Sequence, residues 1–285
     1  MGNGKLSDQH ICHQVSAYAS VVKTAQEASI ADFHKSKLAD IDCKKVNIYA
    51  EKSEEVLFLS DGVCVGEQKP TRDKVPKEGK ERTNINIMML QIPSQTNEPV
   101  FETIVAAEGI DETALAKSLV RKHYKDVSKI PIVCISDGAT CLKNQNKAIF
   151  GDHVVHILDW YHLQAKITQL MSQIAPNKEI KETMIKFLVD NLWNGKTNIA
   201  LLGLNMLKPK NKLKHQELKG YLEKNKPYII DYDYRKSIGK TIGSGRMEKQ
   251  IDMIVAKRQK RKGMAWSAKG ARSLAILTAY HKKYA

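Results

Sequence analysis

The feature that most constrains the fold is a change of hydrophobic period near residue 55. Three stretches, 55–67, 84–92 and 99–107, alternate apolar and polar residues or are rich in β-branched residues, as β-strands are. The links between them are polar or contain proline. Because three strands follow one another without an intervening helix, they are predicted to form an antiparallel meander.

Helices and strands alternate after the meander. Residues 111–124 have a helical period, with Asp111 placed as N-cap. Two nearly continuous apolar runs follow, 130–138 and 153–162, as is typical of buried parallel strands, and the second leads into a long helix. The order β-β-β-α-β-α-β-α predicts an α/β fold with a mixed sheet flanked by helices.

The remaining segments are predicted to be helical. Residues 1–50 form a small N-terminal segment, in which a second helix over 43–52 would give either a truncated helix-turn-helix or an ordinary helical hairpin. Residues 51–285 form the main domain. Within it, residues 176–235 are a helical insertion with a lysine-rich break at 207–215, and 246–262 is predicted to be the last long helix.

Charge points to a polyanionic partner. The net charge is +15, and it is concentrated in one half: residues 1–142 carry 18 basic and 20 acidic side chains, whereas residues 143–285 carry 28 and 11. Nucleic acid is the natural partner for such a surface, although a basic surface can also serve solubility alone. With no apolar run near the ~20 residues of a membrane span and no secretory leader, we expect a cytoplasmic protein without a membrane partner. Five cysteines without a CxxC pair argue against a disulfide framework or a zinc ribbon.

Two predicted strands end in the same tripeptide. Ser-Asp-Gly follows the apolar run of the first strand, with Asp61, and that of the fourth, with Asp137. Either one alone could be an ordinary Asp-Gly turn. If the two strands are neighbours in the sheet, the two carboxylates converge where α/β folds place their chemistry.

A third acid, Glu248, lies behind the glycine-rich turn "IGSG" and at the head of a basic helix. Three carboxylates at one point repel one another unless cations lie between them. Oxygen ligands suit Mg²⁺ or Mn²⁺, and two such ions can serve phosphoryl chemistry. The alternative is that Glu248 only stabilises a helix N-terminus through the helix dipole.

The element order and the three acids resemble the RNase H-like catalytic domain of DDE transposases from bacterial insertion sequences. The C-terminal stretch from 242, with "GSGRME", a basic helix and "GMAWS", resembles the IS-Kra-like group in particular. "HILDWYH" resembles the Asp-Trp-Tyr-His box of such enzymes. The resemblance covers about residues 50–285. Members of that group carry a longer N-terminal DNA-binding region than the fifty residues found here.

The resemblance implies roles for specific residues. Asp61, Asp137 and Glu248 would be the catalytic acids and the ligands of two Mg²⁺ or Mn²⁺ ions, and Asp159 and His162 would be accessory residues. It implies a DNA transposase that cleaves phosphodiester bonds at element ends and transfers the strand to target DNA, as a homo-oligomer in a synaptic complex on the bacterial nucleoid. The alternatives are an RNase H-like nuclease or resolvase without strand transfer, and an inactive DNA-binding remnant.

Other side chains are predicted to contact DNA or to pack. The DNA-binding residues on the last basic helix are predicted to be Lys249, Lys257, Arg258, Lys260, Arg261 and Lys262. His162 could orient a water or a phosphate, or be a structural hydrogen-bonding residue. Trp160 and Tyr161 could stack on a base or pack in the core. Trp266 is expected to anchor the C-terminal helix to the core.

Overall fold

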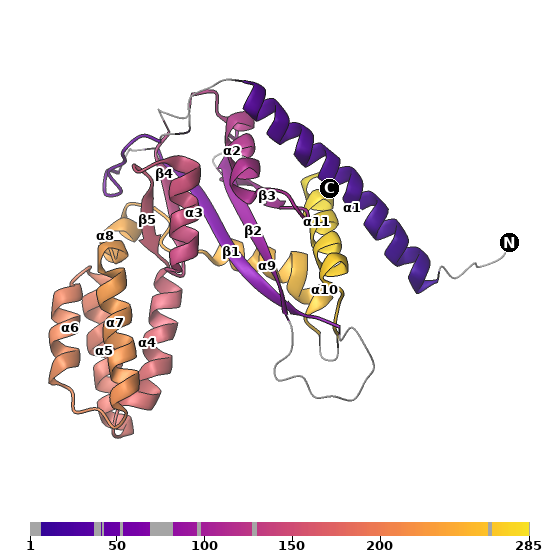
Figure 1. The fold of residues 1–285 in the computed structure, drawn as a ribbon. Coiled ribbons are helices and arrows are strands. Elements are labelled where there is room, and N and C mark those ends of the chain that lie inside the picture. Colours follow the sequence, from indigo (N-terminus) through magenta and orange to yellow (C-terminus); the bar gives the residue numbers. More distant parts are fainter. Residues whose placement is uncertain are drawn as a thin grey trace.

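The fold is taken from a computed structural model (Figure 1). It describes residues 7–36, 41, 43–51, 54–68, 82–95, 98–126, 130–261 and 264–284. Most of the predicted polar loop 68–83, as well as Lys262, lies outside the described residues.

The centre of the molecule is a five-stranded mixed sheet with the order β3-β2-β1-β4-β5. The strands are β1 (Val56–Gly66), β2 (Arg82–Ile92), β3 (Val100–Val105), β4 (Ile132–Ser136) and β5 (Val155–Leu158). β1, β2 and β3 pair antiparallel, as the predicted meander requires, whereas β1, β4 and β5 pair parallel. The α/β class and the mixed sheet are as predicted, and they are consistent with an RNase H-like domain.

Helices surround the sheet and extend from one end of it (Figure 1). They are α1 (Asp8–Lys35), α2 (Glu112–His123), α3 (Thr140–Phe150), α4 (Trp160–Ile174), α5 (Lys178–Trp193), α6 (Thr197–Met206), α7 (Lys212–Asn225), α8 (Tyr232–Ser237), α9 (Gly245–Ile251), α10 (Lys257–Gln259) and α11 (Ala268–Tyr284). Asp111 caps α2 as predicted, since its carboxylate accepts from the backbone N–H groups of Thr113 and Ala114.

The two faces of the sheet have separate cores because side chains alternate along each strand. Leu57 and Leu59 of β1 belong to the core shared with α4, α9 and α11. Phe58 lies between them and packs in the smaller core shared with α2 and α3. The face that a residue occupies in β1 therefore determines which helices it meets.

The N-terminal segment differs from the two-helix prediction. α1 is one helix of 28 residues, and the described residues 43–51 form no helix. The Cys43 N–H instead donates to the Phe150 carbonyl at 2.9 Å, and the Lys44 N–H to the Ile130 carbonyl at 3.0 Å. The predicted second helix is thus wrong over the described residues, and the start of this segment is instead hydrogen-bonded to the body of the domain.

The helical insertion comprises α5 to α8 and lies beyond β5, beside α4 (Figure 1). Its break between α6 and α7 falls within the predicted lysine-rich stretch. At the exit of the insertion, the fully buried guanidinium of Arg235 pairs with the Glu55 carboxylate, which precedes β1. Lys240 lies 3.3 Å from the same carboxylate. This ion pair connects the end of the insertion to the start of the central strand.

The C-terminal region has more parts than predicted. The stretch expected to be one helix over 246–262 consists of α9, a π-helical turn over Asp252–Ala256 and the short α10, and the longer α11 follows it. Between them, the Trp266 N–H donates to the Gly66 carbonyl at 3.0 Å, and its indole N–H donates to the Gln259 carbonyl at 3.2 Å. Trp266 thus joins this connection to the end of β1, in agreement with its expected anchoring role.

Candidate active site

Asp61 lies inside β1 and not at its end. The strand continues to Gly66 because β2 remains paired with it, opposite Asp61 at Ile87 and on to Arg82 opposite Gly66. This corrects the expectation that the Ser-Asp-Gly tripeptide terminates the first strand. The parallel partner β4 does stop here, since its last registered pair with β1 is Leu59 with Ile135.

The register of β1 and β4 brings Asp61 and Asp137 to the same level. Continuing the pairing by two residues from Leu59 and Ile135 places the two aspartates opposite each other. Leu59 and Ile135 pack in the core shared with α4 and α9. Because side chains alternate along a strand, a residue two positions further on belongs to the same face of the sheet. The neighbouring positions of β1 and β4 are as expected, and the convergence of the two carboxylates stays a prediction.

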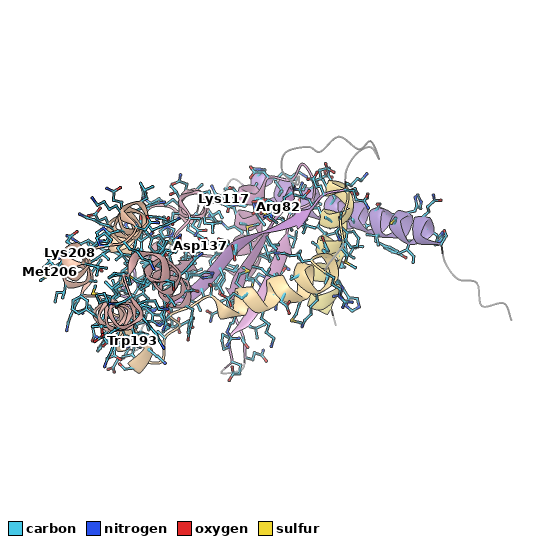
Figure 2. The ribbon with its side chains drawn as sticks, turned by 90° about the horizontal axis from the view of Figure 1, so that it is seen from below. Arg82, Lys117, Asp137, Trp193, Met206 and Lys208 are labelled. Carbon is cyan, nitrogen blue, oxygen red and sulfur yellow. The ribbon has the colours of Figure 1, made fainter. Side chains whose placement is uncertain are left out.

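Asp137 occupies a sharp turn between β4 and α3, where the sheet meets the helical insertion (Figure 2). Its Oδ1 accepts from the Ala139 N–H at 2.9 Å. Gly138 has φ +87°, and a Cβ there would lie 2.7 Å from Asn225 Oδ1. Glycine thus permits both the backbone conformation and the close approach of the insertion, while the Asp137 side chain stays exposed.

The three predicted acids interact electrostatically. Burial raises the pKa of Asp61, the Gly62 N–H lowers it, and the charges of Asp137 and Glu248 raise it further. The charge of His162 acts in the opposite direction. Asp61 therefore has excess negative charge around it, although Glu248 lies 187 residues away in the chain (248 − 61).

Glu248 lies in the first turn of α9, and its side chain is 57% exposed. Its Oε1 is 3.9 Å from His162 Nε2. Ser244, the N-cap residue of α9, ties the start of this helix to α4, because both its N–H and its hydroxyl donate to Asp159 Oδ2. The position of Glu248 thus depends on a contact between two segments 85 residues apart.

Asp159, from the predicted box, is fully buried and saturated with donors. Its Oδ1 caps α4 by accepting from the N–H groups of Tyr161 at 2.7 Å and His162 at 3.0 Å. Burial alone would raise the pKa of Asp159, but the interactions with His162 and Ser244 outweigh it and lower the pKa to about 2. Asp159 is therefore an ionised carboxylate that positions α4 and α9.

His162 lies between these acids. Its Nδ1 is 3.7 Å from Asp159 Oδ2, and its other nitrogen faces Glu248. The interaction with Asp159 raises the pKa of His162 to about 9 against the effect of burial, and the charges of Glu248 and Asp137 add to the rise. The imidazole is consequently a cation near pH 7, which places positive charge beside the carboxylates.

The donor chemistry of the three acids fits divalent cations of the Mg²⁺ type. All three supply hard carboxylate oxygens. Burial is the main cause of the raised pKa of Asp61, and a cation would relieve the smaller contribution that comes from the charges of Asp137 and Glu248. Asp137 and Glu248 are exposed, so ligand waters and a phosphate could reach them. Among the residues that the structure describes, no three His, Cys, Asp or Glu side chains are grouped closely enough to hold a metal ion.

The predicted DNA-binding residues that are described lie after Glu248 along the chain. Arg258 and Arg261 are held by the helix itself, since Arg258 donates to the Met253 carbonyl at 3.3 Å and Arg261 to the Lys257 carbonyl at 2.9 Å. Lys257 also pairs with Asp252 at 3.0 Å. The predicted DNA-binding residues that are exposed are Lys249, Lys257, Arg258, Lys260 and Arg261. Exposed basic side chains therefore follow Glu248 along the chain.

The two aromatic residues of the box have different surroundings. Trp160 is buried, and its ring centroid lies 4.7 Å from that of Trp193 and 5.0 Å from that of Tyr232. Trp160 therefore packs in the core, which is one of the two roles predicted for it. Tyr161 is 55% exposed and covers Gly243, where a Cβ would lie 2.5 Å from its ring. A side chain at position 243 would therefore displace the Tyr161 ring from its present position.

Sequence reasoning missed the role of Ser244. The "GSG" motif contained it, but only the fold shows that its hydroxyl meets Asp159. An aspartate that directly follows a strand and precedes a helix is a recognisable N-cap signal. That local signal would have predicted that Asp159 caps α4, but not that Asp159 also contacts the start of α9.

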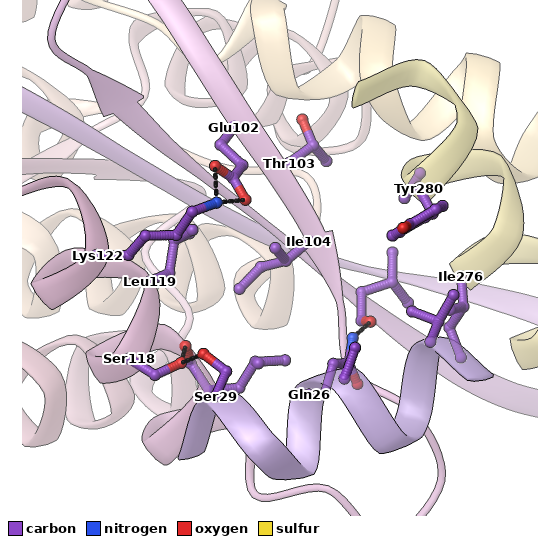
Figure 3. A pocket seen from close by; sticks show the side chains of 15 residues that line it. Gln26, Ser29, Glu102, Thr103, Ile104, Ser118, Leu119, Lys122, Ile276 and Tyr280 are labelled. Atoms are coloured by element: carbon purple, nitrogen blue, oxygen red, sulfur yellow. Dashed lines mark hydrogen bonds and ion pairs between the residues drawn. The ribbon is translucent and has the colours of Figure 1, made fainter. Parts of the chain in front are cut away.

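A separate cavity of about 310 Å³ lies between α1, α2, β3 and α11 (Figure 3). It contains a buried acid, Glu102, but this carboxylate already pairs with Lys122 at 3.1 Å and His123 at 2.6 Å. Ser29 and Ser118 bond to each other there at 3.1 Å. Because these polar groups are satisfied, the cavity does not compete with the carboxylate site.

The comparisons with known proteins add little to this geometry. No family model matches the chain, and no protein of known annotation matches its sequence. A solved structure, the Drosophila P element transposase strand transfer complex, aligns over 99% of this chain and 80% of that chain, with 11% identity and a TM-score of 0.22. That score is too low to carry a structural argument. Separately, none of the described helices combines the length and apolar character that crossing a bilayer demands.

Proposed function

We propose that the chain is a DDE-type DNA transposase. The observation that carries the proposal is that Asp61 and Asp137 both lie just beyond the last pair of the adjacent strands β1 and β4, and that the charges of Asp137 and Glu248 both act on Asp61. A cluster of carboxylates directly before a basic surface suits metal-dependent chemistry on a phosphate backbone.

In this function, Asp61, Asp137 and Glu248 would hold two Mg²⁺ or Mn²⁺ ions. Such ions, when bound, supply activation of the attacking oxygen and stabilisation of the leaving oxygen. In the first reaction, a water oxygen forms a bond to phosphorus at an element end while the P–O3′ bond breaks, which leaves a free 3′-hydroxyl. In the second, the oxygen of that hydroxyl would form a bond to a target phosphorus while the P–O3′ bond of the target breaks, which leaves a 3′-hydroxyl on the target strand. The proposed protein is a homo-oligomer that holds the DNA ends together on the nucleoid.

The chain's own residues have distinct parts in this proposal. Asp159 fixes the start of α9, and with it Glu248, through Ser244. The His162 cation balances charge among the acids. Lys249 and the basic residues beyond it would hold backbone phosphates next to the cleavage point.

The test is cleavage of DNA from the two borders of the segment that encodes the chain, where inverted repeats would mark the element ends. We expect nicking in Mg²⁺, its loss in Glu248→Gln, and joining of the released 3′ end to a plasmid. Metal-free DNA binding by this variant should hold or tighten slightly, since a repulsion with phosphate is removed. Asp152→Asn, which changes an exposed acid away from the cluster, is the matched control.

Each alternative predicts a different result. Nicking without joining would identify a nuclease or resolvase. Binding without nicking would identify an inactive remnant. If Glu248→Gln cleaves within a few-fold of wild type and loses only ~0.3–1 kcal/mol of stability, Glu248 is a helix-dipole acid, and the catalytic assignment fails.

A further inference from the structure

A second polar cluster lies next to Asp137, on the α3 side of the sheet. Lys143 of α3 is only 8% exposed, and its Nζ lies 4.1 Å from the centre of the Tyr228 ring and 3.4 Å from Asn225 Oδ1. Within the described part of the chain, no carboxylate forms an ion pair with it. A buried ammonium without an anionic partner is unfavourable, because burial disfavours the charged form.

His156 of β5 belongs to the same cluster. It is 8% exposed, and neither ring nitrogen has a hydrogen-bond partner among the described residues. His156 pairs in the β4–β5 register with Cys134, which packs on the α3 side of the sheet. The His156 ring meets the Tyr228 ring edge to face, with the ring centroids 6.0 Å apart. A neutral imidazole always has one N–H to donate, so a buried donor here lacks an acceptor.

The charge around the cluster is positive. Burial is the main factor that lowers the pKa of Lys143, and the charge of Lys224 lowers it further. Burial also lowers the pKa of His156 to about 4, with contributions from the charges of Lys143 and Lys147. Asp137 is the acid that acts on Lys143 in the opposite direction. Lys143 thus donates to Asn225 but has no ion-pair partner among the described residues, and His156 has no acceptor there at all.

We propose that Lys143 and His156 form a binding site for a phosphate group beside Asp137. Asn225 connects the two sites, because its Oδ1 contacts Lys143 and lies against Gly138. A strand whose cleaved phosphate is at Asp137 would place a neighbouring backbone phosphate at Lys143. Whether the bound phosphate belongs to a DNA backbone or is free phosphate depends on the proposed function. The anion site itself does not depend on it.

The first experiment measures DNA binding in EDTA, so that it needs no catalysis. Lys143→Gln should reduce the slope of log K against log salt by roughly 0.9 for duplex or 0.7 for single strands, the amount expected when one phosphate is no longer neutralised. The control is Lys178→Gln on α5, a lysine that is 85% exposed and lies near Glu182. It should leave the slope unchanged. A slope for Lys143→Gln equal to that of wild type overturns the DNA-backbone assignment.

The second experiment needs no substitution in the observed protein. Nitrogen NMR of the histidine rings, with His156 assigned by the loss of its signal in His156→Asn, is followed as inorganic phosphate or a short oligonucleotide is added to the wild type. A shift of the His156 signal with the oligonucleotide supports a backbone-phosphate site, and a shift with inorganic phosphate alone supports a free-phosphate site. If neither addition moves it, the anion site is rejected even if the protein cleaves DNA.

Discussion

Asp159 and Glu248 show how two acids in one region acquire different properties from their surroundings. Asp159 is buried and receives donors on both oxygens, from the N–H groups of Tyr161 and His162 and from Ser244. Glu248 is exposed and has only a distant contact with His162. The first carboxylate is therefore committed to structure, whereas the second remains available to a ligand.

The Asp159 pKa gives a prediction at the residue scale. Because folding lowers this pKa from 3.8 to about 2, the ionised carboxylate contributes about 2 kcal/mol of stability above pH 4. That contribution is lost as the pH falls from about 4 to about 2. Asp159→Asn should flatten the stability curve over this window and cost ~1–3 kcal/mol at pH 7, because a Ser244 donor then faces an amide NH₂.

Urea unfolding midpoints measured between pH 2 and pH 7 test this prediction. Asp152→Asn is the control, because Asp152 is 91% exposed and its removal should leave the shape of the curve unchanged. If Asp159→Asn keeps the acid sensitivity of wild type, the low pKa and the Ser244 contact are both misassigned.

His162 predicts a pH dependence of stability that has the opposite sign. Its pKa is raised to about 9, so its stabilising charge is fully present below pH 6.5 and is lost as the pH rises through about 9. His162→Gln should therefore remove a decline in stability between about pH 7 and 9. Unfolding midpoints over this range provide the measurement, and His281→Gln, an exposed histidine on α11, is the comparison. An unchanged decline in His162→Gln would show that the imidazole is not a cation in the fold.

At the scale of elements, the insertion is held by a buried ion pair. Arg235 donates to Glu55 and to the backbone carbonyls of Ile48 and Thr241. It thereby joins α8, the residues before β1 and the approach to α9. Since α9 carries Glu248, the ion pair fixes the path by which the chain returns from the insertion to the sheet.

Removing one partner of this pair should be costly. Arg235→Ala leaves Glu55 buried with only Lys240 beside it, so we expect a loss of roughly 3 kcal/mol. The double variant Arg235→Met with Glu55→Leu should recover most of the loss, because the buried charge is then removed with its partner. Guanidinium unfolding of both variants tests this. A single variant with less than ~1 kcal/mol of destabilisation would mean that water replaces the arginine.

At the scale of the whole molecule, positive charge is distributed over two separate regions. One consists of the exposed basic residues from Lys249 to Arg261, after the candidate active site, and the other is the helical insertion, where Lys208, Lys210 and Lys212 are exposed. Coulomb attraction alone does not decide which region DNA follows. The carboxylate site adjoins the first region, so that region is expected to carry the phosphate contacts.

Replacing Lys257, Arg258, Lys260 and Arg261 together by glutamine should flatten the slope of log K against log salt by roughly 0.9 for each phosphate that these side chains neutralise in the wild type. The matched control replaces four lysines of the insertion, Lys178, Lys181, Lys186 and Lys196, by glutamine, so that the net charge changes equally. Nonspecific duplex binding over a salt series gives both slopes. If the control flattens the slope more, the DNA path runs over the insertion.

The sequence by itself determined the features that depend on neighbours along the chain. The strand and helix order followed from hydrophobic period, and the cap of α2 from one aspartate. Asp61 and Asp137 stood out because apolar runs precede both, and the sheet order makes their level coincide. Such features are encoded within a few residues, where backbone geometry and side-chain alternation act.

The tertiary structure decided whatever depends on distant partners. β1 continues past Asp61 because β2 pairs with it, and the non-helical segment 43–51 is joined to the body of the domain through the N–H groups of Cys43 and Lys44. The contact of Asp159 with Ser244, and the buried group around Lys143 and His156, unite segments that lie dozens of residues apart. The physical reason is that burial and hydrogen bonding depend on distance in space, and a local pattern carries no record of which segments will meet.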